Sequence, residues 1–191
     1  KQHQEGRGIP GLFAINQDYT GNSRELVLAY CKGIGLTHIG VFESTFKEET
    51  ETDLFGEQII LTGGIPKLIQ SSYKVLLEAR YSPVTAWFVC YYELKTIVDM
   101  FHSKGFEFMN SAISDTAEYG GITRGSRIID QHVEDEMRSA LKEIQSGEFH
   151  KEWQKEAEDG FPTLSKLREE EKNLPIQKIG NSILKDLFEK K

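Results

Sequence analysis

Hydrophobic and polar residues follow two different patterns along this chain, and the pattern changes near residue 45. Before that point, short apolar runs at residues 12–15 and 39–42 are typical of buried strands, and residues 25–31 form an apolar-faced helix between them. A strand–helix–strand unit of this length predicts two parallel strands. Because two strands alone do not make a stable sheet, we expect this unit to be the end of a larger α/β domain whose earlier strands are missing.

Helical periods replace the strand-like alternation after residue 45. We predict helices at residues 49–61, 65–79, 83–104, 108–118, 130–146, 148–159, 163–173 and 176–189, separated by Gly and Pro. The segment 83–104 is apolar nearly all round, which indicates a helix buried on most sides. An isologous dimer of intertwined helices could provide that cover. Residues 148–173 are instead rich in Glu and Lys, as solvated helical faces are. The fold class is therefore mainly α.

Composition narrows the class of protein. The formal charge of −7 argues against a nucleic-acid partner, which needs clustered Lys and Arg. No apolar run approaches the length of a membrane span, and neither a signal nor a transit segment opens the chain. The two cysteines make no disulfide framework, and the five histidines show no zinc-like spacing. We expect a cytoplasmic protein that binds neither nucleic acid nor membrane.

Asp53 and Glu57 are the first candidates for chemistry. They lie four residues apart, so on a helix both carboxylates share one face within reach of a common ion. Like charges beside apolar neighbours such as Leu54 and Phe55 repel unless a cation lies between them, and a hard cation such as magnesium would serve. The alternative is a solvated surface pair, which is the commoner meaning of this spacing.

Two further segments carry candidate residues. Glu93 lies in the most apolar helix, where a carboxylate is rarely buried without a partner. It could bind an ion, be partly exposed, or pair with another segment of the chain. Ser114 could contact a ligand, and Ser114 or Asp115 could equally cap a helix.

These segments, in this order, resemble the ketol-acid reductoisomerase family. Residues 47–58, Lys-Glu-Glu-Thr-Glu-Thr-Asp-Leu-Phe-Gly-Glu-Gln, are similar to the family signature almost letter for letter. The remaining matches are Gly6-Arg7-Gly8, Gln17-Asp18, Gly63-Gly64, Glu93-Leu94-Lys95, Ile97-Val98-Asp99, Ser114, residues 116–120 and residues 175–184. The resemblance covers essentially the whole chain.

The resemblance implies two domains. Residues 1–45 would end an NADPH-binding Rossmann-like domain, and residues 46–191 would form a knotted all-helical domain for metal binding, substrate binding and dimerisation. The chain is similar to the short-form class, whose helical domains intertwine as a homodimer and share their active sites.

The resemblance also assigns residues to the reaction. Asp53 and Glu57 would bind magnesium, with Asp53 bridging two ions, Glu93 would be catalytic and help to hold the second ion, and Ser114 would contact the substrate carboxylate. The family rearranges and reduces acetohydroxy acids in valine, isoleucine and leucine biosynthesis. NADPH would bind through the missing N-terminal domain, with no cofactor-binding residue in this chain, so residues 1–191 alone should be inactive.

One departure from the family pattern bears on this expectation. Val89 stands where the family has a Glu, one helical turn before Glu93, so the second magnesium loses a protein ligand. Tyr92 and Asp115 also differ, replacing a His and an Asn. Together with the absent cofactor domain, Val89 favours an alternative hypothesis, a non-catalytic dimerisation module or degenerate relative.

Overall fold

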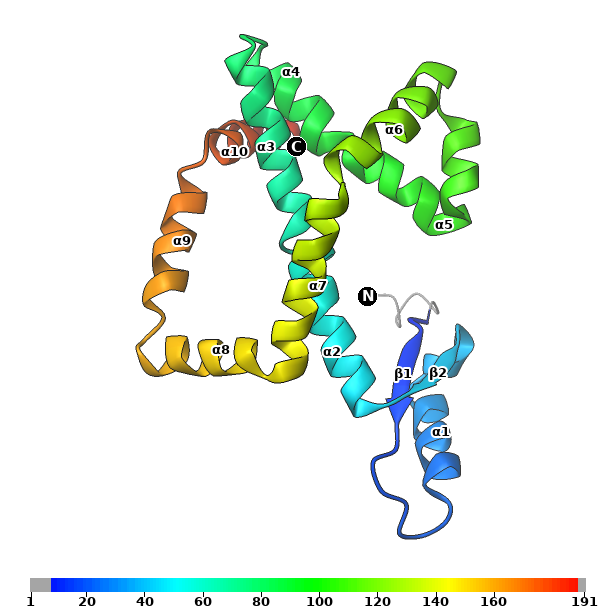
Figure 1. The fold of residues 1–191 in the computed structure, drawn as a ribbon. Helices are drawn as coiled ribbons and strands as arrows, with labels where there is room; N and C mark the ends of the chain where they lie inside the picture. The colour runs from blue at the N-terminus through cyan, green and yellow to red at the C-terminus, as the bar shows by residue number, and fades with distance from the viewer. Residues whose placement is uncertain (1–7, 189–191) are drawn as a thin grey trace. The chain divides into compact units, whose positions relative to one another are not determined.

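The computed structural model describes the backbone of residues 8–188. Gly6 and Arg7 of the upstream motif, and residue 189 of the last predicted helix, lie outside the described residues. Contacts divide the chain into two compact units, Lys1–Gly56 and Glu57–Lys191. Figure 1 labels the helices and strands along the chain.

The first unit confirms the predicted strand–helix–strand. Strands β1 (Gly11–Ala14) and β2 (Val41–Ser44) pair in parallel, with Gly11 opposite Val41. Helix α1 (Ser23–Gly33) and the short 3₁₀ turn η1 (Leu36–His38) connect them, and α2 (Phe46–Gly56) follows. Figure 1 shows α1 lying along the two strands. The Arg24 guanidinium joins α1 to β2 through a 3.2 Å contact with Glu43.

The start of α1 is fixed by the side chain of Asp18. One carboxylate oxygen accepts hydrogen bonds from the backbone N–H groups of Thr20, Gly21 and Ser23, and from the Ser23 hydroxyl at 2.7 Å. These bonds lower the pKa of Asp18, the Ser23 hydroxyl most of all. The carboxylate thus satisfies the Ser23 N–H, one of the donors that the first turn of a helix leaves unpaired, and orders Thr20 and Gly21 ahead of it.

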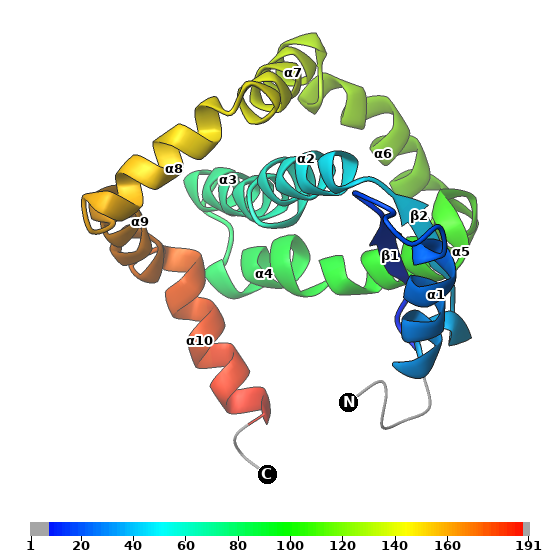
Figure 2. The same cartoon turned by 90° about the horizontal axis from the view of Figure 1, so that it is seen from below.

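The second unit is helical. Its elements in order are η2 (Glu57–Leu61), α3 (Gly64–Glu78), α4 (Pro83–Trp87), η3 (Phe88–Tyr92), α5 (Leu94–Ala112), α6 (Asp115–Ile128), α7 (Gln131–Ser146), α8 (Glu148–Glu158), α9 (Pro162–Lys172) and α10 (Pro175–Phe188). Both η2 and η3 are π-helical turns. Figure 2 shows α7, α8, α9 and α10 following one another around α3. Among the described residues, no helix is long and apolar enough to cross a membrane.

The core of this unit lies where α3, α4 and α10 meet. Trp87 is its centre, with 2% of its surface exposed, and it is surrounded by Tyr73, Ala86 and Ile176. The Trp87 ring stacks on Tyr91 at 5.4 Å between centroids. Because residues from three helices bury this one indole, it determines how they dock.

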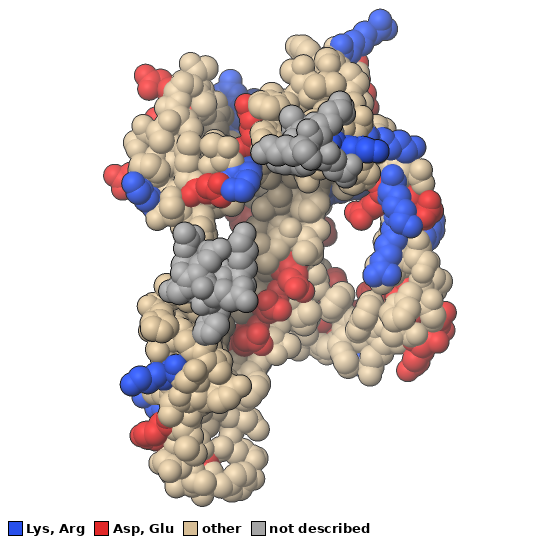
Figure 3. Space-filling view, turned by 180° about the vertical axis from the view of Figure 1, so that it is seen from behind, with Lys and Arg blue, Asp and Glu red and all other residues tan. Residues whose placement is uncertain are grey.

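The charged segment near the C-terminus is solvated, as predicted. Ion pairs run along the surface of α8 and α9, from Lys155 to Asp159 and from Lys172 to Glu169 at 3.2 Å each. Figure 3 shows both signs of charge over this part of the molecule. Such exposed pairs contribute little to stability and mainly keep the face soluble.

The predicted helix at 108–118 is wrong. The preceding helix continues to Ala112 past a kink at Gly105, whose φ of 83° is left-handed, and a new helix runs from Asp115 to Ile128. The Ser114 hydroxyl starts the new helix by accepting a hydrogen bond from Ala117 N–H. Gly120-Gly121 was interpreted as a break and lies inside α6, although each glycine costs about 1 kcal/mol there.

The segment 83–104 is less buried in one chain than its composition predicts. Ala86 and Trp87 are buried, whereas Phe88, Val89 and Tyr91 are each between 44% and 48% exposed. The segment is also divided into α4, η3 and the start of α5. A large apolar surface therefore stays uncovered within the chain.

Candidate functional site

Asp53 and Glu57 lie in consecutive helical elements. Asp53 belongs to α2 in the first unit, and Glu57 begins η2 in the second. Both are exposed, and neither carboxylate has a hydrogen bond or an ion pair with any residue that the structure describes. Glu48 and Glu49 lie in the first turn of α2, where negative charge interacts favourably with the helix dipole. The oxygens of Asp53 and Glu57 are thus available to a ligand.

Glu93 follows the second π-helical turn. Its backbone N–H donates to the Phe88 carbonyl at 3.0 Å, across five residues, and its side chain is exposed. Lys95 pairs with Asp99 and not with Glu93. Of the interpretations open for Glu93, an ion pair with another described segment is therefore excluded, and exposure agrees with the structure. Val89 lies inside the same π turn and is 48% exposed.

Ser114 is a helix cap, as one of the two interpretations had it. Its φ and ψ of −73° and 150° are extended, and its Oγ accepts from Ala117 N–H at 3.3 Å. A capping serine uses its oxygen as acceptor and keeps its own O–H as donor. Capping therefore leaves Ser114 able to donate a hydrogen bond to an anionic ligand.

The candidate ligands form no metal-binding group of three within the described part of the chain. Among the side chains that the structure describes, residues 8–185, no group of three or more His, Cys, Asp or Glu is placed to hold a metal ion. A cavity of about 240 Å³ is lined by apolar residues such as Ile69 and Trp87 and by polar ones such as Gln70, and none of the candidate residues lines it. Neither the metal site nor the substrate site is thus complete in the described part of a single chain.

Gln58, directly after Glu57, also indicates that the site lacks a partner. Its side-chain Nε2 is buried and has no hydrogen-bond partner among the residues that the structure describes. A buried donor left unpaired costs about 1–3 kcal/mol, so an acceptor from outside the chain would stabilise it. Neither Gln58 nor the two π turns were predicted from the sequence. The only nearby feature noted there was Gly63-Gly64, which lies between two predicted helices and matches the family pattern.

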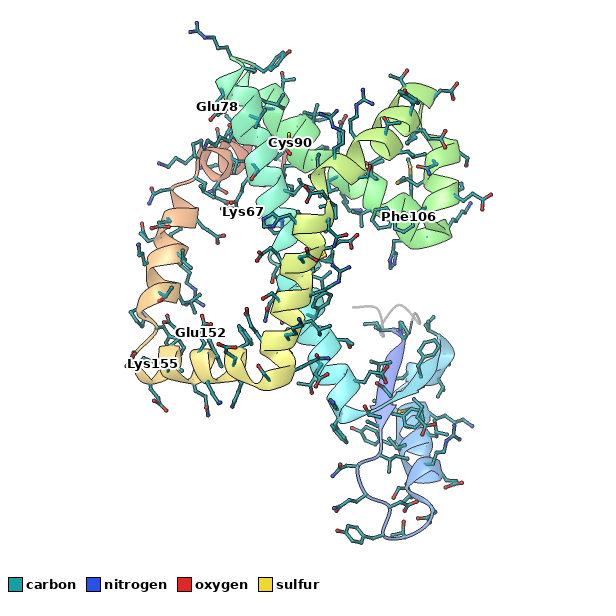
Figure 4. All side chains as sticks on the ribbon, in the orientation of Figure 1. Lys67, Glu78, Cys90, Phe106, Glu152 and Lys155 are labelled. Carbon is teal, nitrogen blue, oxygen red and sulfur yellow. The ribbon has the colours of Figure 1, made fainter. Side chains whose placement is uncertain are left out.

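The two cysteines agree with free thiols. Cys31 is buried in the first unit, and Cys90 is half-buried in η3 (Figure 4). Burial raises the pKa of the Cys90 thiol, which disfavours the reactive thiolate. We assign no chemistry to either one.

Comparison with known proteins matches two family descriptions. "Ketol-acid reductoisomerase, C-terminal domain" matches residues 46–188, and "Acetohydroxy acid isomeroreductase, NADPH-binding domain" matches residues 1–40. Together they account for nearly the whole chain.

Two relatives give the same result. The chain is 49% identical over 185 residues to the ketol-acid reductoisomerase (NADP(+)) of Methanocaldococcus jannaschii, covering 97% of this chain and 56% of that protein. It is also similar to the solved structure of an NADH-preferring ketol-acid reductoisomerase from an uncultured archaeon, with a TM-score of 0.91 and 42% identity, over 96% of this chain and 55% of that one. The chain thus spans a little over half the length of each relative.

Proposed function

Because this chain belongs to the ketol-acid reductoisomerase family, we propose that it supplies the metal- and substrate-binding half of such an enzyme. The observation that carries the proposal is the set of exposed carboxylates Asp53, Glu57 and Glu93, none of which has a partner among the described residues. Being unpaired does not by itself distinguish them, because other exposed carboxylates such as Glu152 on α8 also have no described partner. Three that stay free, at the positions that resemble the family's ligands, suit an external cation.

The donor set fits magnesium. Carboxylate oxygens are the ligands that this hard cation prefers, and one or two carboxylates completed by water are a common arrangement. Asp53 and Glu57 would hold one ion, with Asp53 bridging to a second ion that Glu93 helps to bind. Val89 offers no oxygen, so the second site would depend more on water and substrate.

Each proposed residue has a distinct part in the reaction. Bound magnesium would polarise the ketone and hydroxyl oxygens of the acetohydroxy acid and stabilise the charge that develops as the alkyl group migrates. Ser114 would donate its free O–H to the substrate carboxylate and so fix the orientation of the substrate. Glu93, beside the reacting oxygens, would act as the catalytic carboxylate. Reduction would use NADPH bound by the domain to which residues 1–45 belong. Residues 46–191 would form the knotted helical domain that follows it in the chain.

A second copy of the chain would complete the site. Among the described residues the carboxylates form no group of three, Gln58 lacks an acceptor, and the apolar face of 83–104 is uncovered. An intertwined homodimer that shares its active sites would resolve all three. The preference between NADPH and NADH stays open, since similar relatives use either.

Calorimetric titration of the protein with Mg²⁺ tests this proposal. We expect binding that Asp53→Asn and Glu57→Gln each weaken strongly, whereas Glu152→Gln, an exposed carboxylate on α8, leaves it unchanged. Consumption of NADPH with 2-acetolactate, measured in the presence of a complete cofactor domain, should follow the same order. Equal Mg²⁺ binding by all the variants would refute the assignment.

Val89 supports a second candidate, a dimerisation module without activity. The reductoisomerase activity of Val89→Glu, compared with that of the parent protein, distinguishes the enzyme from the module. A large gain in reductoisomerase activity would identify Val89 as a lesion, whereas no activity in either form, with the dimer intact, would favour the module.

A further inference from the structure

Two of the three proposed ligands adjoin π-helical turns. Glu57 is the first residue of η2, and Glu93 directly follows η3. Such turns are rare inside helical segments and occur frequently at functional sites, because the extra residue in the turn is costly and redirects the side chains beside it. The turn at Glu57 is the better defined of the two, because its hydrogen bonds converge on one atom.

That atom is the backbone carbonyl oxygen of Glu57. It accepts the Thr62 N–H at 2.9 Å, which is the π-type bond, and the Gly63 N–H at 3.2 Å. The Thr62 hydroxyl donates a third hydrogen bond to it at 2.9 Å. Thr62 is exposed, so water could have satisfied its hydroxyl. The hydroxyl instead donates to the Glu57 carbonyl oxygen, so the backbone and the side chain of Thr62 both hold that atom.

The glycines after Thr62 are required by the same geometry. A Cβ on Gly63 would lie 1.9 Å from the Gln58 carbonyl oxygen, and one on Gly64 would lie 1.9 Å from that of Ile59. Both clashes are with backbone, which no side-chain rotation can relieve. Only glycine therefore allows the π turn to close directly against the start of α3.

We propose that Thr62, together with Gly63 and Gly64, is a positioning residue that holds the Glu57 backbone in the π turn and so aims its carboxylate at the metal. This proposal rests on the proposed function, in which Glu57 binds magnesium. If the turn relaxed to an α-helix, one residue would shift in register, and the side chains on its two sides would rotate relative to each other by about 100°. A rotation of that size would remove the carboxylate from an ion that Asp53 also binds.

The test uses Mn²⁺ as a spectroscopic substitute for Mg²⁺. Electron paramagnetic resonance of free Mn²⁺ gives the dissociation constant for the parent protein, Thr62→Val, Thr62→Ser and Glu57→Gln. Thr123→Val is the matched control, because the Thr123 hydroxyl also donates to a helical carbonyl, that of Tyr119, in α6. We expect Thr62→Val to raise the dissociation constant about tenfold, the lower end for groups that orient a metal ligand. Thr62→Ser, which keeps the hydroxyl, should restore the parent value, and Thr123→Val should not change it.

Amide hydrogen exchange gives a second readout that needs no metal. Thr62→Val should speed exchange at Thr62 and Gly63, while the thermal midpoint falls no further than in Thr123→Val. Unchanged Mn²⁺ binding in Thr62→Val, or an equal loss in Thr123→Val, would overturn the positioning role while the function stands. Parent and Glu57→Gln binding Mn²⁺ equally would instead refute the metal site itself, and the positioning role with it.

Discussion

Gly180 offers the sharpest test of how the helical core is assembled. It lies in α10 and is buried, and a Cβ added there would lie 2.7 Å from Nε1 of Trp87. Trp87 is 2% exposed and stacked on Tyr91, so moving its ring away from residue 180 would disturb that stacking. Gly180→Ala should therefore force α10 away from α4.

The magnitude follows from two opposing terms. Ala stabilises a helix relative to Gly by about 0.5–1 kcal/mol, and overpacking a core costs about 1–3 kcal/mol. Gly125→Ala in α6 supplies the first term alone, because nothing lies within 4 Å of the added Cβ. The two variants should therefore differ in free energy of unfolding by about 1–3 kcal/mol, which is the packing term.

Urea unfolding followed by circular dichroism measures this difference. Both variants are compared at one protein concentration, because a dimer's stability depends on concentration. The urea midpoint should fall for Gly180→Ala relative to Gly125→Ala, with the same slope. If Gly180→Ala stabilised the protein as much as Gly125→Ala does, α10 would not pack on Trp87 and this description of the core would be wrong.

Three further outcomes are expected. The Asp18 carboxyl, titrated by NMR, should show a pKa below its usual value of about 3.9, and Ser23→Ala should raise that lowered pKa. The stabilisation from this carboxylate is complete at neutral pH and is lost as the pH falls from the usual pKa through the lowered one. Alkylation of Cys90, followed by mass spectrometry, should stay slow until the pH exceeds the usual thiol pKa of about 8.5, because burial raises it further; reaction at neutral pH at the rate of free cysteine would contradict this. Val89→Glu should strengthen binding of a second Mg²⁺ in calorimetry, and an unchanged isotherm would mean that residue 89 does not face the ion.

The helices and strands were predicted correctly wherever the hydrophobic period ended at residues that cap or stop a helix or strand. The parallel strands of the first unit and the helices from α7 to α10 were found, because caps such as Asp130 and stops such as Gly147 lie at their ends. The boundary between α5 and α6 was placed wrongly, because Gly120-Gly121 is a stronger breaker in sequence than in the helix that Ser114 caps.

The candidate site was predictable as a set of residues but not as a geometry. The spacing of Asp53 and Glu57 and the resemblance to a family identify which carboxylates to consider. The π turns could not be predicted, because η2 lies at the end of a predicted helix and η3 lies in the segment 83–104, which is apolar nearly all round and so shows no change of period. Thr62 thus gave no signal, since its part depends on a hydrogen bond to a backbone atom five residues earlier.

The position of the bound metal decides whether Asp53 and Glu57 are its ligands. Crystals of the protein grown with Mn²⁺ would reveal the ion by its anomalous scattering, and crystals with Mg²⁺ would give its coordination. We expect carboxylate oxygens of Asp53 and Glu57 about 2.1 Å from Mg²⁺, with Glu93 from either copy of a dimer close to a second ion. An ion bound elsewhere, with Asp53 and Glu57 directed into solvent, would contradict it.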